Sequence, residues 1–143
     1  MKEKILVSAC FLHNGYKYNG DANINQKVKD LELKYDFILI CPEVFGGLST
    51  PRLPSEIVRD KVLNNIGEDV TNQFRLGAQK ALELAKLNNC KKAILKAKSP
   101  SCGKGLVYDG TFSHNVVAGD GVAAKLLMEN GIEVFTEFEL DLL

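Results

Sequence analysis

Four cysteines are the residues of this 143-residue chain best suited to carry chemistry: Cys10, Cys41, Cys90 and Cys102. In a reducing compartment, cysteines serve as metal ligands or nucleophiles more often than as disulfides. The first ten residues contain too few apolar side chains for a secretory signal or a membrane-spanning helix, so we expect a cytoplasmic protein without membrane contact. The position of each thiol relative to the predicted strands then decides its role.

Runs of consecutive apolar residues alternate with stretches of helical spacing. Consecutive Ile, Leu and Val are typical of strands covered on both faces, as in a parallel sheet. Asn64, Asn65 and Gly67 are turn formers, and they favour a short hairpin within residues 56–70. The pattern predicts strands at 4–9, 36–40, 92–97 and 133–136, and helices at 23–33, 72–87 with Thr71 as N-cap, and 120–130 with Asp120 as cap and Gly131 as the stop.

This order of elements predicts an α/β fold: a single three-layer α/β/α Rossmann-like domain over residues 1–143, with a mainly parallel sheet and a small appended hairpin. Ligand sites in such sheets form at the carboxyl ends of the strands. Cys10 follows the first predicted strand, Cys41 follows the second, and Cys102 lies five residues beyond the third. These three thiols are therefore expected to converge as a metal site, whereas Cys90 precedes its strand and is expected at the opposite edge.

The residues leave two kinds of metal site open. Structural zinc takes four ligands, often two of them from a CxxC pair that this chain lacks, so His13 or His114 would have to be the fourth. An iron–sulfur cluster is held by thiolates, and a four-iron cluster held by three of them leaves one iron open to a substrate. Lys plus Arg and Asp plus Glu both number 18, a balance that disfavours nucleic-acid partners and favours a small molecule.

Four groups of residues resemble motifs of the thiouracil desulfurase (TudS) family, in the family's order. They are Ser-Ala-Cys at 8–10 with Tyr-Asn-Gly-Asp at 18–21, Cys-Pro-Glu-Val-Phe-Gly-Gly-Leu at 41–48 with Pro-Arg-Leu-Pro at 51–54 and Glu56, Ser-Pro-Ser-Cys-Gly at 99–103, and Gly-Asp-Gly-Val at 119–122. The resemblance implies a 4Fe-4S-dependent desulfidase that removes sulfur from a thiolated pyrimidine, such as 2-thiouracil or 4-thiouridine monophosphate, and releases hydrogen sulfide.

The resemblance also implies roles for individual residues. The 4Fe-4S cluster ligands carry over to Cys10, Cys41 and Cys102, the catalytic acid/base to Glu43, and the active-site serine to Ser101. Ser99 is a weaker candidate and is placed in substrate binding.

The chemistry of the groups adds a mechanism and leaves rivals open. A thiocarbonyl sulfur on iron would make its carbon electrophilic, Glu43 would take a proton from the attacking water, and Ser101 would relay or hold a proton. Arg52, in preference to Lys17 or Lys104, would bind a phosphate if the substrate is a nucleotide. A non-catalytic zinc or iron–sulfur module, a metal-free cysteine-nucleophile enzyme and a small-nucleotide binding protein stay open, as do a homodimer and the identity of the natural substrate; tRNA is disfavoured.

Overall fold

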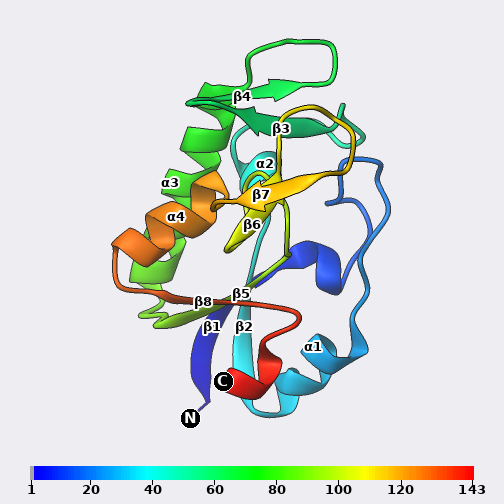
Figure 1. Cartoon of the computed structure of the whole chain (residues 1–143). Coiled ribbons are helices and arrows are strands. Elements are labelled where there is room, and N and C mark those ends of the chain that lie inside the picture. The colour runs from blue at the N-terminus through cyan, green and yellow to red at the C-terminus, as the bar shows by residue number, and fades with distance from the viewer. Residues whose placement is uncertain (1) are drawn as a thin grey trace.

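A four-stranded parallel sheet forms the centre of the protein. The computed structural model describes residues 2–143, and its sheet contains β1 (Glu3–Ser8), β2 (Tyr35–Ile40), β5 (Lys92–Leu95) and β8 (Glu133–Thr136) in the order β2-β1-β5-β8 (Figure 1). These are the four runs expected from the sequence, so the predicted parallel sheet is confirmed. The third strand ends at Leu95 rather than at residue 97.

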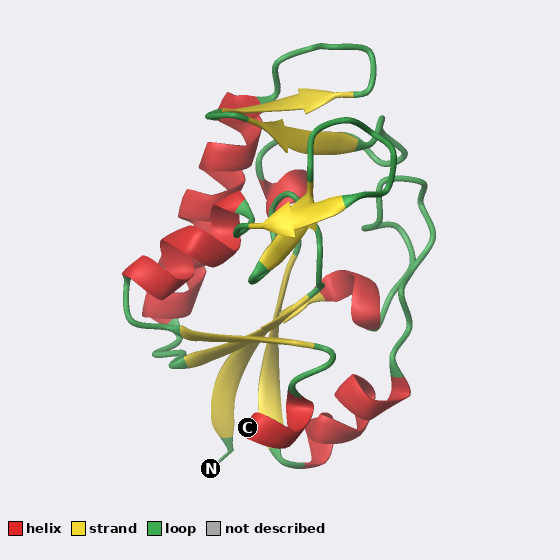
Figure 2. Ribbon diagram, in the orientation of Figure 1, coloured by secondary structure: helices red, strands yellow, loops and turns green. Residues whose placement is uncertain are grey.

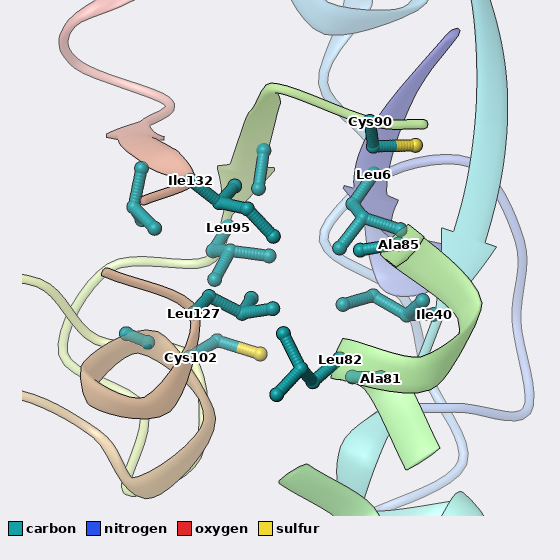
Figure 3. Packing of buried hydrophobic residues seen from close by; sticks show 13 residues of the cluster. Leu6, Ile40, Ala81, Leu82, Ala85, Cys90, Leu95, Cys102, Leu127 and Ile132 are labelled. Carbon is teal, nitrogen blue, oxygen red and sulfur yellow. The ribbon is translucent and has the colours of Figure 1, made fainter. Parts of the chain in front are cut away.

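Two apolar cores cover the two faces of the sheet. Helices α3 (Thr71–Leu87) and α4 (Val122–Glu129) pack on one face, where Leu6 and Leu127 lie in the cluster shown in Figure 3. The other face is covered by α1 (Gln26–Asp30) and by the short helices Ala9–Phe11, Leu31–Leu33 and Leu140–Leu142. Ile5 and Val7 point into this second core, so consecutive residues of β1 are fully buried on opposite sides. The three-layer α/β prediction is therefore confirmed.

Two hairpins lie beyond the carboxyl ends of the sheet strands (Figure 2). The predicted hairpin is confirmed as β3 (Ser55–Val58) paired with β4 (Lys61–Asn64). The chain reverses at Arg59 and Asp60, however, and the Asn64–Gly67 segment forms the turn that follows. The second hairpin pairs β6 (Leu106–Tyr108) with β7 (Val116–Ala118) and was not predicted, because β7 is exposed along its whole length and has no alternating pattern.

The side chains expected to cap α3 and α4 have other partners. The Thr71 hydroxyl accepts the N–H of Val62 at 2.9 Å, and the Asp120 carboxylate accepts the N–H of Gly105 at 2.8 Å. Both predicted caps are therefore wrong, because tertiary contacts compete for the same oxygen atoms. Gly131, in contrast, has a φ of 82° and ends α4 as expected.

Backbone carbonyls take the place of a side-chain cap on α4. The N–H of Val122 donates to the carbonyl of Pro100 at 2.9 Å, and the N–H of Ala123 donates to that of Ser101 at 2.8 Å. The first N–H groups of α4 are thus occupied by the loop that follows β5, which fixes this loop to the helix. The helix predicted at 23–33 is shorter than expected: α1 begins after Asn25, whose side chain accepts the N–H of Val28, and a 3-10 turn completes the segment.

Glycines allow α2 (Pro42–Phe45) to lie directly on α3. A Cβ atom at Gly77 would overlap the carbonyl oxygen of Pro42, and one at Gly46 would overlap that of Gln73. Because α2 directly follows Cys41, this backbone contact fixes the position of the loop after β2. Among residues 2–143, no helix is long and apolar enough to cross a membrane.

Replacing Gly77 by alanine tests this contact. At an open helical position the change would stabilise the fold by about 1 kcal/mol through helix propensity. Here the added methyl group meets backbone, so we expect Gly77→Ala to lower the free energy of unfolding by roughly 2 kcal/mol or more in urea melts. Lys80→Ala, at an exposed position of the same helix, is the control and should change it by less than about 0.5 kcal/mol. Equal stability of the two variants would contradict the close packing of α2 on α3.

Candidate functional site

The loops at the carboxyl ends of β1, β2 and β5 enclose a cavity of about 330 Å³. This size lies within the range of small-molecule sites. All seven residues named as candidates from the sequence line it, although they come from four separate segments of the chain. They are Cys10, Cys41, Glu43, Arg52, Ser99, Ser101 and Cys102.

Three thiols converge on this cavity. Cys10 and Cys41 are half-buried and Cys102 is buried. Burial raises the pKa of each thiol, that of Cys102 to about 12; a Cys41 thiolate would further raise the pKa of Cys10, and both would raise that of Cys102. The free thiols are therefore neutral at physiological pH, and a bound metal would have to displace their protons.

Cys90 lies away from the cavity. It is buried in the apolar core on the α3 side of the sheet, at the opposite end of the cluster from Cys102 in Figure 3. Cys102 belongs to the same core but also lines the cavity. The location expected for Cys90 from its place before β5 agrees with this arrangement.

The thiols do not form a site for a single metal ion. Within residues 2–143, no three His, Cys, Asp or Glu side chains are arranged to hold a single metal ion. A tetrahedral zinc site completed by His13 or His114 therefore does not fit. A four-iron cluster binds each thiolate at a different iron, so three thiols around a cavity are the donor set that such a cluster requires.

The carboxylate of Glu43 connects the loop after β2 with the loop after β5. Its Oε1 accepts the Nε–H of Arg52 at 2.9 Å, and its Oε2 accepts the hydroxyl of Ser101 at 3.1 Å. The oxygen of Ser99 accepts the N–H groups of Ser101 and Cys102, both at 3.1 Å, so its own proton is free to be donated to Ser101, 3.0 Å away. The hydroxyls thus donate in one direction, from Ser99 to Ser101 to Glu43.

The guanidinium of Arg52 donates hydrogen bonds to other groups of the protein. Besides Glu43, its guanidinium donates to the carbonyl of Tyr16 at 2.7 Å and to the hydroxyl of Thr50 at 3.0 Å, and its side chain is only 7% exposed. This geometry lets Arg52 orient the carboxylate of Glu43. The contact of Arg52 with a substrate phosphate stays a prediction. Lys17 and Lys104 are the alternatives to Arg52 for binding a phosphate. Lys17 lines the cavity, and Lys104 forms an ion pair with Glu139.

Sequence reasoning assigned no place in the cavity to several of its residues, among them Glu56, Lys96 and Tyr108, and it considered His114 only as a zinc ligand. Glu56 belongs to one of the motifs described above, but the sequence does not show that its side chain is buried. Tyr108 and His114 flank the loop of the unpredicted β6–β7 hairpin, and no pattern in the sequence places that loop over the sheet.

A three-layer α/β fold with a thiol-lined cavity and a carboxylate held beside it defines the class of protein as one that can hold a metal–sulfur group next to a carboxylate. A family model described as 2-thiouracil desulfurase matches residues 5–139, and the chain belongs to this family.

Two relatives are similar along almost their whole length. A solved structure named 4Fe-4S-dependent thiouracil desulfidase TudS superposes with a TM-score of 0.93 at 41% identity, covering 99% of this chain and 95% of that one. A Bacillus subtilis (strain 168) protein called "Uncharacterized protein YbbK" is also 41% identical, over 96% of this chain and 97% of its own.

Thiol labelling checks the burial of the four cysteines. In protein prepared without metal, iodoacetamide at pH 8 should modify Cys10 and Cys41 first, because both are half-buried, whereas Cys90 and Cys102 are 6% and 5% exposed. Because burial raises the pKa of Cys102 to about 12, its labelling should need unfolding rather than a moderately higher pH. Peptide mass spectrometry identifies the modified residues, and rapid labelling of Cys102 in the folded protein would contradict the structure.

Proposed function

We propose that this chain is a 4Fe-4S-dependent desulfidase that converts a thiolated pyrimidine, 2-thiouracil or 4-thiouridine monophosphate, to the oxo-pyrimidine and hydrogen sulfide. The observation that carries the proposal is the convergence of three thiols on one cavity beside a carboxylate bonded to a serine hydroxyl. The family of the chain and its similarity to the TudS structure support it. We further propose that residues 1–143 act as one cytoplasmic domain.

The reaction balances without an oxidant or a reductant. One water molecule adds its oxygen to the ring carbon, the carbon–sulfur bond breaks, and the sulfur leaves with the two protons of that water. The protein therefore has to bind a planar ring, polarise its thiocarbonyl, and move protons from the water to the departing sulfur.

Cys10, Cys41 and Cys102 are the residues that would hold the cluster. Held by these three thiolates, a four-iron cluster would keep one iron without a protein ligand and would supply a thiophilic Lewis acid for the sulfur of the substrate. Cys102 is only 5% exposed, so its thiol is shielded from bulk water.

Glu43 would accept a proton from water. It lies in the cavity two residues after Cys41, and the Arg52 guanidinium and the Ser101 hydroxyl hold its two oxygens in place. A carboxylate held by two donors loses little freedom when it accepts the proton. Arg52 acts here as a positioning residue, and Ser101 is the hydroxyl that can pass a proton between Glu43 and a bound substrate.

The size of the cavity supports a small substrate. A volume of about 330 Å³, which the cluster and the substrate would share, lies in the small-molecule range, and the equal numbers of acidic and basic residues provide no general attraction to a polynucleotide. A thiolated base or its monophosphate is therefore preferred over tRNA.

Metal content and turnover test the assignment together. Protein purified or reconstituted without oxygen should contain about four irons and matching acid-labile sulfide per chain and release sulfide from 2-thiouracil or 4-thiouridine monophosphate. Alanine at Cys10, Cys41 or Cys102 should remove both properties. The matched control, Cys90→Ala, should keep both, because its thiol lies in the core. Absence of iron after reconstitution would refute the proposal and leave a thiol-based or binding function.

Variants of the carboxylate network separate catalysis from cluster binding. Glu43→Gln should keep iron and sulfide at the wild-type level and lower kcat by roughly 10²- to 10⁴-fold, the range for loss of a general base. Arg52→Lys should keep the charge but lose the bonds that orient Glu43, so a smaller fall in kcat is expected. Visible absorbance and sulfide release measure the two effects, and full turnover by Glu43→Gln would remove this residue from the mechanism.

A further inference from the structure

Two aromatic rings of the β6–β7 hairpin line the cavity. Tyr108 is the last residue of β6, and His114 lies in the loop that leads to β7. Their ring centroids are 6.2 Å apart and their planes meet at 81°, so one ring contacts the other through its edge. The two rings therefore form a corner, with one aromatic face perpendicular to the other.

The loop that carries these rings is held by a buried carboxylate that the proposed chemistry does not use. Glu56, on β3, is only 7% exposed, and its Oε1 accepts the N–H groups of Gly110 at 2.9 Å and Phe112 at 3.1 Å. A Cβ atom at Gly110 would come within 2.8 Å of the carbonyl of Ile57, so the loop also touches β3 through its backbone.

Two residues of this loop have an energetically unfavourable backbone conformation. Phe112 and His114 have φ values of 58° and 64°, which side chains other than glycine rarely adopt. Such a conformation persists only where surrounding contacts hold it. The two hydrogen bonds to Glu56 are contacts of this kind, since one is donated by the N–H of Phe112 itself and the other by the N–H of Gly110, two residues earlier.

We propose that Tyr108 and His114 form an aromatic wall that recognises the planar ring of the substrate, and that Glu56 is the positioning residue that holds this wall. The inference rests on the proposed function, because the ring to be recognised is that of a thiolated pyrimidine. A flat conjugated ring stacks on an aromatic face, and in a right-angled corner it also meets the second ring edge-on. The wall thereby selects flat rings, while the thiols and Glu43 act on the thiocarbonyl.

Steady-state kinetics on the cluster-loaded enzyme with 2-thiouracil test the wall. Loss of one stacking partner weakens base binding by roughly tenfold, so Tyr108→Ala and His114→Ala should each raise KM by about that factor and leave kcat within about twofold. Val117→Ala is the matched control, because Val117 lies on β7 of the same hairpin, is exposed, and does not line the cavity. Unchanged KM values in both ring variants would overturn the wall.

Two substitutions of Glu56 distinguish positioning from direct contact with the substrate. Glu56→Ala removes the acceptor of both N–H groups and should raise KM about as much as loss of a ring. Glu56→Gln keeps a carbonyl oxygen that can accept the same two bonds, so it should recover most of this loss. If Glu56→Gln is as impaired as Glu56→Ala while both keep iron and melting temperature, the charge of Glu56 acts on the substrate and the positioning role is wrong.

A binding measurement separates failure of the wall from failure of the proposed function. Calorimetry with uracil, which contains no sulfur to release, should show weaker binding to Tyr108→Ala than to the wild-type protein. The substrate analogue 5,6-dihydro-2-thiouracil has a puckered, less conjugated ring, so the wild-type enzyme should discriminate against it and Tyr108→Ala should discriminate less. Wild-type turnover with unchanged uracil binding in the variant refutes the wall alone, whereas an iron-loaded wild-type protein that releases no sulfide refutes the proposed function.

Discussion

Because β2, β1 and β5 run in the same direction and lie side by side, the chain leaves all three at one edge of the sheet. Every candidate residue of the cavity depends on this constraint. Cys10, Cys41 and Cys102 are separated by tens of residues in the sequence, and no local motif brings them together. Parallel pairing does so, since it places the ends of neighbouring strands in adjacent loops. The buried strands behind these loops form a rigid base, with Ile5, Leu6 and Val7 fully buried in the two cores.

Contacts of these loops with helices and with each other hold the cavity residues in defined positions. The backbone of α2 touches that of α3 at Gly77, and the start of α4 is capped by the carbonyls of Pro100 and Ser101. Helix α3 thus holds the loop that contains Cys41, and helix α4 holds the loop that contains Cys102. The Glu43 carboxylate then joins the two loops through Arg52 and Ser101. A site whose groups are already held in position reorganises little when a substrate or a metal–sulfur group binds.

The two hairpins add a second layer to the site, beyond the edge of the sheet. The β3–β4 hairpin supplies Glu56, whose carboxylate holds the loop between β6 and β7. His114, in that loop, and Tyr108, at the end of β6, both line the cavity. The proposed chemistry therefore resides in loops anchored to the sheet and helices, and the proposed recognition of the ring resides in a hairpin that is held by a few long-range bonds. This division would let the hairpin vary while the thiols and Glu43 stay in place.

The sequence by itself determined the parallel sheet, its four strands and the edge at which Cys10, Cys41 and Cys102 meet, because buried strands have consecutive apolar residues and each of these cysteines lies in the segment that follows a strand. It also marked Glu43, Ser99, Ser101 and Arg52 through their motifs. Only the tertiary structure decided that Arg52 holds Glu43, that Thr71 and Asp120 do not cap their helices, and that Glu56 anchors a loop more than fifty residues away. The physical reason is the range of the interactions. Apolar periodicity is local and can be read along the chain, whereas the partner of a polar side chain is chosen among groups that only the folded chain brings within hydrogen-bonding distance.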